Sequence, residues 1–149
     1  MADDRPRSER MRSIEALSSR TAQDLAVQME RQRLRLTQAE TRLAELTEYL
    51  ASYASGTGGR SVTAMQLTET HLFVEKLKEA VRLQEGVVDK ARSGFEASRA
   101  RWISQHVRTT ALGSAVHRFA VEEARERDLR EQHLQDEVAA RYHKPPVGD

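Results

Sequence analysis

Apolar residues recur every three or four positions over most of the chain, which is the spacing of one face of an α-helix. Before residue 56 the repeat comprises Ile14, Leu17, Thr21, Leu25, Met29, Gln32, Leu36, Ala39, Leu43, Leu46, Leu50 and Tyr53. After residue 63 it comprises Val74, Leu77, Val81, Gln84, Val88, Ala91, Phe95, Ser98, Trp102, Gln105, Thr109, Leu112, Val116 and Phe119. The steps alternate three and four, as in a coiled-coil heptad. Between Leu17 and Met29 consecutive steps of four predict a stutter.

A glycine-rich stretch, Gly56-Thr-Gly-Gly-Arg60, separates the two repeats. A phosphate-binding loop would follow a strand and, in its Walker form, contain a lysine followed by a hydroxyl residue. This stretch has neither, so it indicates a reversal of the chain. Gly56 suits the residue that closes a helix, and Thr63 with Gln66 has the capping-box spacing that opens one. We therefore predict an all-α fold, an antiparallel coiled-coil hairpin of two long helices with the second longer than the first.

The predicted single domain consists of a helix over about 8–55, a turn at 56–62, a helix over about 63–142 and a short tail at 143–149. Folding the chain about Gly58 gives a register of facing pairs: Leu36 with Val81, Leu25 with Arg92, and Ile14 with Trp102. In this register the first helix ends near residue 110 of the second, so the apolar repeat continues without a partner. Such a face usually binds another molecule. An offset between the helices, or a cover from the N-terminal arm, is the alternative.

Composition supports long exposed helices. Of 149 residues, 32% are charged, and the 24 basic and 23 acidic side chains nearly cancel. A dedicated nucleic-acid binder would present a basic face. No cysteine is present, the N-terminus lacks the apolar run of a signal peptide, and no stretch approaches the ~20 apolar residues of a membrane span. We therefore expect a cytoplasmic protein.

The sequence offers no chemistry typical of an enzyme. No two of the five histidines are three or four residues apart, as a helical metal site would prefer. The carboxylates lie almost all beside Arg or Lys, and a hairpin has no cleft in which to desolvate a general acid. We predict no catalytic residue, no metal ligand and no cofactor.

Near the turn, two rows of side chains are expected at similar heights. Arg42, Leu46, Tyr49 and Tyr53 line up on the first helix, and Phe73, Leu77, Ala80 and Gln84 on the second. Tyr49 and Phe73 fall just outside the strict repeat, so we expect them to be partly exposed. They indicate either an aromatic hot spot for a protein partner or a slightly widened core.

The order and spacing of several short motifs resemble the FliJ family of flagellar export proteins. The motifs are Gln38-Ala39-Glu40 with Leu43, Leu46, Tyr49 and Tyr53, then Phe73 with Leu77 and Ala80, then Trp102 and Lys144-Pro145. The resemblance implies a component of the flagellar type III export apparatus, peripheral to the inner membrane at the flagellar base. Members of the family look like the central stalk of rotary ATPases.

The resemblance also implies partners, namely the hexameric ring of the export ATPase FliI, the export gate protein FlhA and export chaperones, with membrane contact only through these partners. The family's gate-binding surface corresponds to Leu46, Tyr49, Tyr53, Phe73, Leu77 and Ala80, while Arg42 and Gln84 occupy the same stripe but match its pattern less well. For the ATPase ring we predict contacts at the open end of the hairpin, from Met11, Ile14, Leu112, Val116 and Phe119. Alternative readings are an injectisome-type stalk, a nucleic-acid-binding coiled-coil arm and a plain structural spacer.

Overall fold

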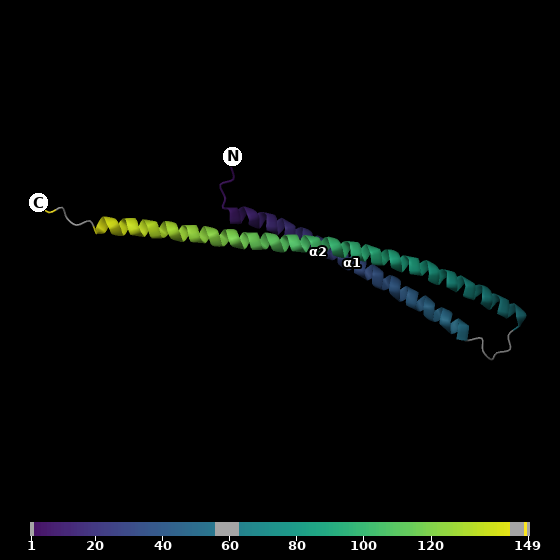
Figure 1. Ribbon diagram of the computed structural model, residues 1–149. Coiled ribbons are helices and arrows are strands. Elements are labelled where there is room, and N and C mark those ends of the chain that lie inside the picture. The colour runs from purple at the N-terminus through teal and green to yellow at the C-terminus, as the bar shows by residue number, and fades with distance from the viewer. Residues whose placement is uncertain (1, 56–62, 144–147, 149) are drawn as a thin grey trace. The chain divides into compact units, whose positions relative to one another are not determined.

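The computed structural model describes residues 2–55, 63–143 and 148, and within them the chain forms two helices and no strand (Figure 1). Helix α1 spans Arg7–Ser55 and helix α2 spans Ala64–Tyr142. The predicted all-α fold, with the second helix longer than the first, is confirmed. The expected turn with Gly56, and Lys144-Pro145, lie outside the described residues.

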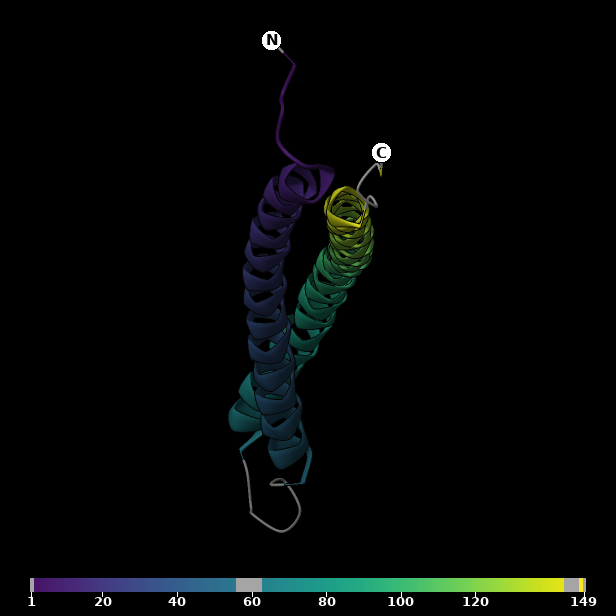
Figure 2. The same ribbon diagram turned by 90° about the vertical axis from the view of Figure 1, so that its left-hand side faces the viewer.

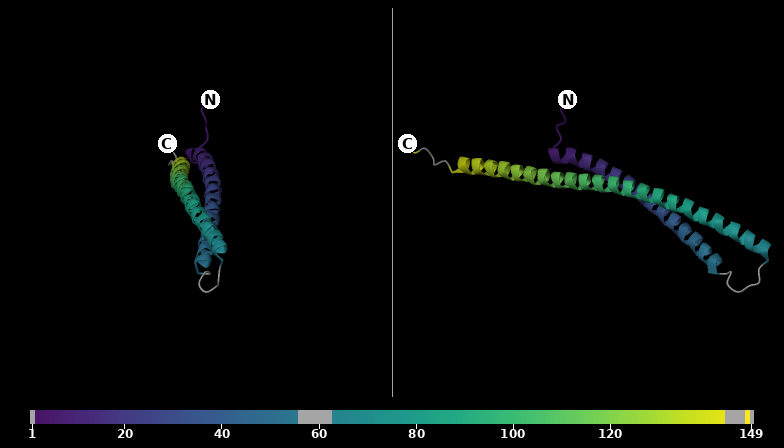
Figure 3. Two further views of the ribbon diagram at one scale, coloured as in Figure 1. Left: turned by 90° about the vertical axis from the view of Figure 1, so that its right-hand side faces the viewer. Right: turned by 45° about the vertical axis from the view of Figure 1, so that its right-hand side comes forward.

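The chain divides into two compact units, each containing a part of both helices. Unit 1 comprises Met1–Ala22 with Ser104–Asp149, and unit 2 comprises Gln23–Ile103. In each unit the two helices lie side by side, as Figure 2 and Figure 3 show from different directions. The expectation of a single domain stays a prediction.

In unit 2 the helices are antiparallel, since contacts move up α2 as they move down α1. The rings of Tyr53 and Phe73 have centroids 4.9 Å apart. Further along, Gln84 Nε2 donates a hydrogen bond to the Ala39 carbonyl at 3.0 Å. The predicted inward residues of α1 from Leu25 to Leu50 are all buried or half-buried, as are those of α2 from Val74 to Trp102. The repeat in this unit is therefore the seam between the helices.

In unit 1 the inward face of α1 differs from the predicted one. Ile14 and Leu17 are 50% and 66% exposed, and Thr21 is exposed too. The residues that α2 covers are instead Ser8, Met11, Glu15, Ser18 and Ala22. Their steps alternate three and four and continue into Leu25 and Met29 without a double step of four. The predicted stutter is therefore wrong, and the heptad repeat is continuous from Ser8.

The register predicted by folding about Gly58 is also wrong. Arg92 lies beside Glu40, at 3.7 Å between Nη2 and Oε1, and not beside Leu25. In unit 1, Ser18 hydrogen-bonds Gln105 and Thr109, while Ser8 reaches Glu123. The first helix therefore covers α2 well beyond residue 110. Of the two readings open at the sequence level, an offset between the helices is the one observed.

Local contacts explain where α2 begins and why two glycines occur within it. Thr63 N–H donates to Gln66 Oε1 at 3.2 Å and Gln66 N–H donates to Thr63 Oγ1 at 3.3 Å, which confirms the predicted capping box. A Cβ atom added at Gly94 would lie 3.0 Å from Gln32 Oε1, and one at Gly113 would lie 3.0 Å from an oxygen of Glu15. These glycines leave space for polar side chains that face inward from α1.

Candidate protein-binding surfaces

The eight residues predicted to bind the export gate all lie in unit 2, but they differ in exposure. Leu77 is buried, and Leu46, Ala80 and Gln84 are half-buried in or beside the seam. The exposed members are Arg42, Tyr49, Tyr53 and Phe73. The structure thus separates a supporting row from an exposed row. The structure is compatible with both interpretations of these eight residues. Some of them widen the core, and others are exposed and could contact a protein partner.

Tyr49 and the Tyr53–Phe73 pair have different structural roles. The Tyr53 and Phe73 rings are tilted by 55° and join α1 to α2. Aromatic pairs of this geometry contribute about 0.5–1.5 kcal/mol beyond their buried area. Tyr49 lies one turn before Tyr53 and is 61% exposed. Tyr49 is therefore the aromatic ring of the stripe that is most available to a partner.

Heptad positions define two flanks of unit 2. With inward residues labelled a and d, positions g and c lie on one side of the seam and positions e and b on the other. The ion pair of Glu40 with Arg92 joins two e positions, so equivalent positions of the two helices meet. Tyr49 and Phe73 are both at g and share the opposite side. We name the g and c side the aromatic flank and the e and b side the ion-pair flank.

The aromatic flank extends further along α2 than the sequence reasoning indicated. Val87 follows Phe73 and Ala80 at intervals of seven residues and is 50% exposed. Leu83, at position c between Ala80 and Val87, is exposed as well. Neither was assigned to the stripe. Heptad spacing from Phe73 was the signal that could have found Val87.

The five residues predicted to contact the ATPase ring belong to unit 1 and are mostly covered. Val116 is only 8% exposed, Met11, Leu112 and Phe119 are half-buried, and Ile14 is exposed. The prediction that the apolar repeat of α2 lacks a partner beyond residue 110 is therefore wrong, because α1 covers it as far as Glu123. The involvement of these five residues in ring binding stays a prediction.

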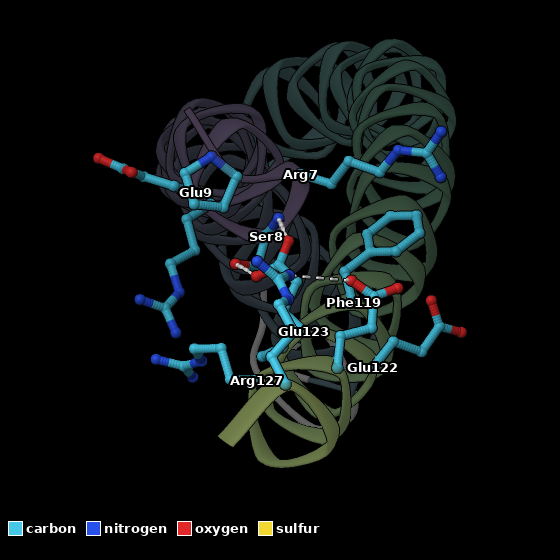
Figure 4. A pocket seen from close by; sticks show the side chains of 12 residues that line it. Arg7, Ser8, Glu9, Phe119, Glu122, Glu123 and Arg127 are labelled. Carbon is cyan, nitrogen blue, oxygen red and sulfur yellow. Dashed lines mark hydrogen bonds and ion pairs between the residues drawn. The ribbon is translucent and has the colours of Figure 1, made fainter. Parts of the chain in front are cut away.

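Glu123 ends the paired part of unit 1 and caps α1 (Figure 4). Its carboxylate accepts a hydrogen bond from Ser8 N–H at 3.0 Å and another from the Ser8 hydroxyl. The first N–H groups of a helix have no partner within it, and the helix dipole favours a negative charge there. The Ser8 hydroxyl and N–H, with Arg127 nearby, lower the pKa of Glu123. A shallow hollow lined by the first turn of α1, Phe119 and charged residues of α2 surrounds this contact.

Beyond Ala124, every described residue of α2 is exposed. The last turns of the helix extend past the first turn of α1 (Figure 1). They carry both charged residues and the exposed apolar side chains Leu129, Leu134, Val138 and Tyr142. An ion pair one helical turn long forms here, between Arg130 and Glu126 at 3.8 Å. Glu123, four residues before Arg127, binds Ser8.

No group of three or more His, Cys, Asp or Glu side chains among residues 2–55, 63–143 and 148 is placed to hold a metal ion. Neither described helix has a stretch long and apolar enough to cross a membrane.

The family model described as Flagellar FliJ protein matches residues 7–145. No curated protein and no solved structure matches the chain. The family match spans both helices, including the exposed aromatic residues near the end of α1 and the start of α2. The chain therefore belongs to the FliJ family and is a component of the flagellar export apparatus.

Proposed function

We propose that this protein connects the export ATPase ring to the membrane export gate and assists export chaperones, working in the cytoplasm at the inner face of the membrane. Family membership and the distribution of exposed apolar residues support this proposal. A connecting protein needs two contact surfaces that act independently. The chain offers one in each unit.

The gate contact is assigned to the aromatic flank of unit 2. The observation that carries this assignment is the exposure of Tyr49 beside the paired rings of Tyr53 and Phe73. Interface hot spots are enriched in tyrosine, and rings on a rigid helix lose little entropy on binding. Leu46, Leu77 and Gln84 support the flank from the seam. FlhA is the partner proposed for this surface.

The ring contact is assigned to α2 beyond Ala124. Val116 is buried and Leu112 and Phe119 are half-buried against α1, whereas the exposed apolar residues Leu129, Leu134, Val138 and Tyr142 have no helix beside them. Charged residues of both signs surround these side chains. A contact of scattered apolar groups and weak surface ion pairs suits reversible association with the ring of FliI.

Gate binding by purified protein tests the proposal. Tyr49→Ala should weaken binding to the cytoplasmic part of the export gate by at least about tenfold, in the range of interface hot spots. Leu34→Ala is a matched control, since Leu34 is similarly exposed and lies away from both flanks. Helix content measured by circular dichroism should be unchanged in both variants. If Tyr49→Ala and the unaltered protein bind the gate with equal affinity, the assignment of the gate to this surface is contradicted.

A further inference from the structure

Charge is distributed unevenly between the two flanks of unit 2. Positions b, e and f hold all five ion pairs found among the described residues of this unit, which are Glu30–Arg33, Glu75–Lys78, Glu79–Arg82, Asp89–Arg92 and Glu40–Arg92. The b and e positions alone, which form the ion-pair flank, hold six acidic and five basic side chains. The ion-pair flank therefore presents little net charge to a partner.

The aromatic flank has the opposite character. Its g and c positions hold six basic residues, Arg31, Arg35, Arg42, Lys76, Lys90 and Arg101, against three acidic ones, Asp24, Glu45 and Glu69. Within the described part of the chain, none of these six basic side chains forms an ion pair. The flank with the exposed aromatic rings is thus also the flank with unneutralised positive charge.

Three apolar side chains lie between two lysines along this flank of α2. One row runs through Phe73, Lys76, Ala80, Leu83, Val87 and Lys90, with steps of three and four. It covers about 26 Å of helix at 1.5 Å per residue. Arg35 and Arg42 lie at g positions of α1, on the same flank. Burial of the exposed Leu83 and Val87 side chains against a partner would be stabilising. The cations beside them could form charge-assisted hydrogen bonds with carboxylates of that partner.

We infer that the aromatic flank binds an acidic amphipathic helix of a protein partner, with apolar side chains against Leu83 and Val87 and carboxylates toward Arg35, Arg42, Lys76 and Lys90. Assigning that helix to the export gate rests on the proposed function, but the chemistry of the flank does not. A single-stranded nucleic acid would need rings for its bases to stack on. The row on α2 beyond Phe73 offers aliphatic groups instead.

A designed peptide of about 18 residues tests this chemistry on the whole protein. Its helix carries leucines in one row and glutamates on both sides, and a second peptide has lysines in place of the glutamates. The acidic peptide should bind, and its affinity should fall between about 0.05 M and about 0.5 M NaCl, because salt screens exposed charges. The lysine peptide should not bind.

Paired variants locate the binding. Arg42→Gln with Lys90→Gln should weaken binding of the acidic peptide about fivefold at low salt and reduce its salt dependence. Arg33→Gln with Lys78→Gln removes the same charge from the ion-pair flank and should change affinity by less than about twofold. Val87→Asn should lower affinity without altering the salt dependence. Val27→Asn, at an equally exposed valine away from both flanks, should have no effect.

Several outcomes would overturn the inference. These are equal losses in both charge variants, binding of the lysine peptide, or tighter binding of an oligouridine of similar length than of the acidic peptide. The export-gate fragment separates this inference from the proposed function. Gate binding that depends on Tyr49 but is unaffected by salt and by substitution of Arg42 and Lys90 would contradict the inference and leave the proposed function intact. If the peptides bind as expected but the gate fragment does not bind, the assignment of the gate to this surface is contradicted and the inference stands.

Discussion

Polar residues occupy seam positions that a coiled coil usually fills with apolar ones, and each is accommodated individually. The Ser18 hydroxyl lies 2.7 Å from Thr109 Oγ1 and accepts a hydrogen bond from Gln105 Nε2 at 2.8 Å. Glu15 lies over Gly113, where no Cβ competes for space. Among the described residues no buried side-chain nitrogen or oxygen lacks a partner. Since an unpaired buried polar group costs stability, these matches favour one alignment of α1 on α2.

Glu123 provides a pH-dependent test of this residue-level picture. Its folded pKa is lowered, chiefly by the hydrogen bond from the Ser8 hydroxyl. A lowered pKa means that Glu123 contributes stability above the ordinary Glu pKa of about 4.3 and loses the contribution as pH falls below it. Glu123→Gln should therefore be less stable than the unaltered protein at pH 7, and the difference should shrink at lower pH. Urea unfolding at several pH values measures this.

The neighbouring carboxylate is the control for that experiment. Glu122 is exposed and is not part of the cap on α1. Glu122→Gln should leave the pH dependence of unfolding close to that of the unaltered protein. A constant stability difference for Glu123→Gln across the acidic range would show that the cap at Ser8 does not form in solution.

At the level of helices, apolar periodicity was sufficient to predict α2 and most of α1. Every predicted inward residue of α2 from Val74 to Phe119 is buried or half-buried, and so is α1 from Leu25 to Leu50. The exceptions are Tyr53, which is 38% exposed, and the start of α1, where hydrophobicity pointed to Ile14 and Leu17. A continuous heptad repeat turns Glu15 and Ser18 inward instead. The polar seam residues Gln105 and Thr109 were the signal that polar partners were needed on α1.

The register could not be deduced from the turn. Placing the pairs symmetrically about Gly58 assumes that both helices leave the turn at the same height. Side-chain contacts far from the turn set the observed register. In it, Glu40 faces Arg92 and Ser8 faces Glu123. A heptad repeat looks alike after every shift of seven residues, so apolar spacing cannot distinguish such shifts. Only the hydrogen bonds and ion pairs between polar residues of the two helices distinguish one shift from another.

Engineered cysteines test the register directly, because the chain has no native cysteine. Ser18→Cys with Thr109→Cys should form a disulfide within the monomer under mild oxidation, since their side-chain oxygens lie 2.7 Å apart. Ser8→Cys with Thr109→Cys, the pair that folding about Gly58 would bring together, should not. In the structure Ser8 pairs with Glu123, which is about 21 Å along α2 from Thr109. Efficient cross-linking of the second pair would contradict the observed register and support the one predicted by folding about Gly58.

For the whole molecule, the two proposed partner surfaces fall in different compact units. The gate surface belongs to unit 2, and the ring surface belongs to the part of unit 1 where α2 has no covering helix. Additivity is expected for sites that share no contacts. Loss of one surface should therefore leave the other functional.

Truncation after Ala124 tests this separation. The shortened chain retains Glu123 and hence its contact with Ser8, so both units should keep their helix pairing. It lacks Leu129, Leu134, Val138 and Tyr142, so it should fail to stimulate ATP hydrolysis by the export ATPase. Its affinity for the gate fragment should change by less than about twofold. Full stimulation by the shortened chain would place the ring contact elsewhere.

The claim that one chain contacts both the gate and the ATPase is tested most directly by site-specific photocross-linking in the native bacterium. A benzophenone amino acid replaces Tyr49 in one strain and Val138 in another, both being exposed positions. Mass spectrometry of the adducts should identify the export gate protein from position 49 and the export ATPase from position 138. The same partner at both positions, or the two partners interchanged, would contradict the account.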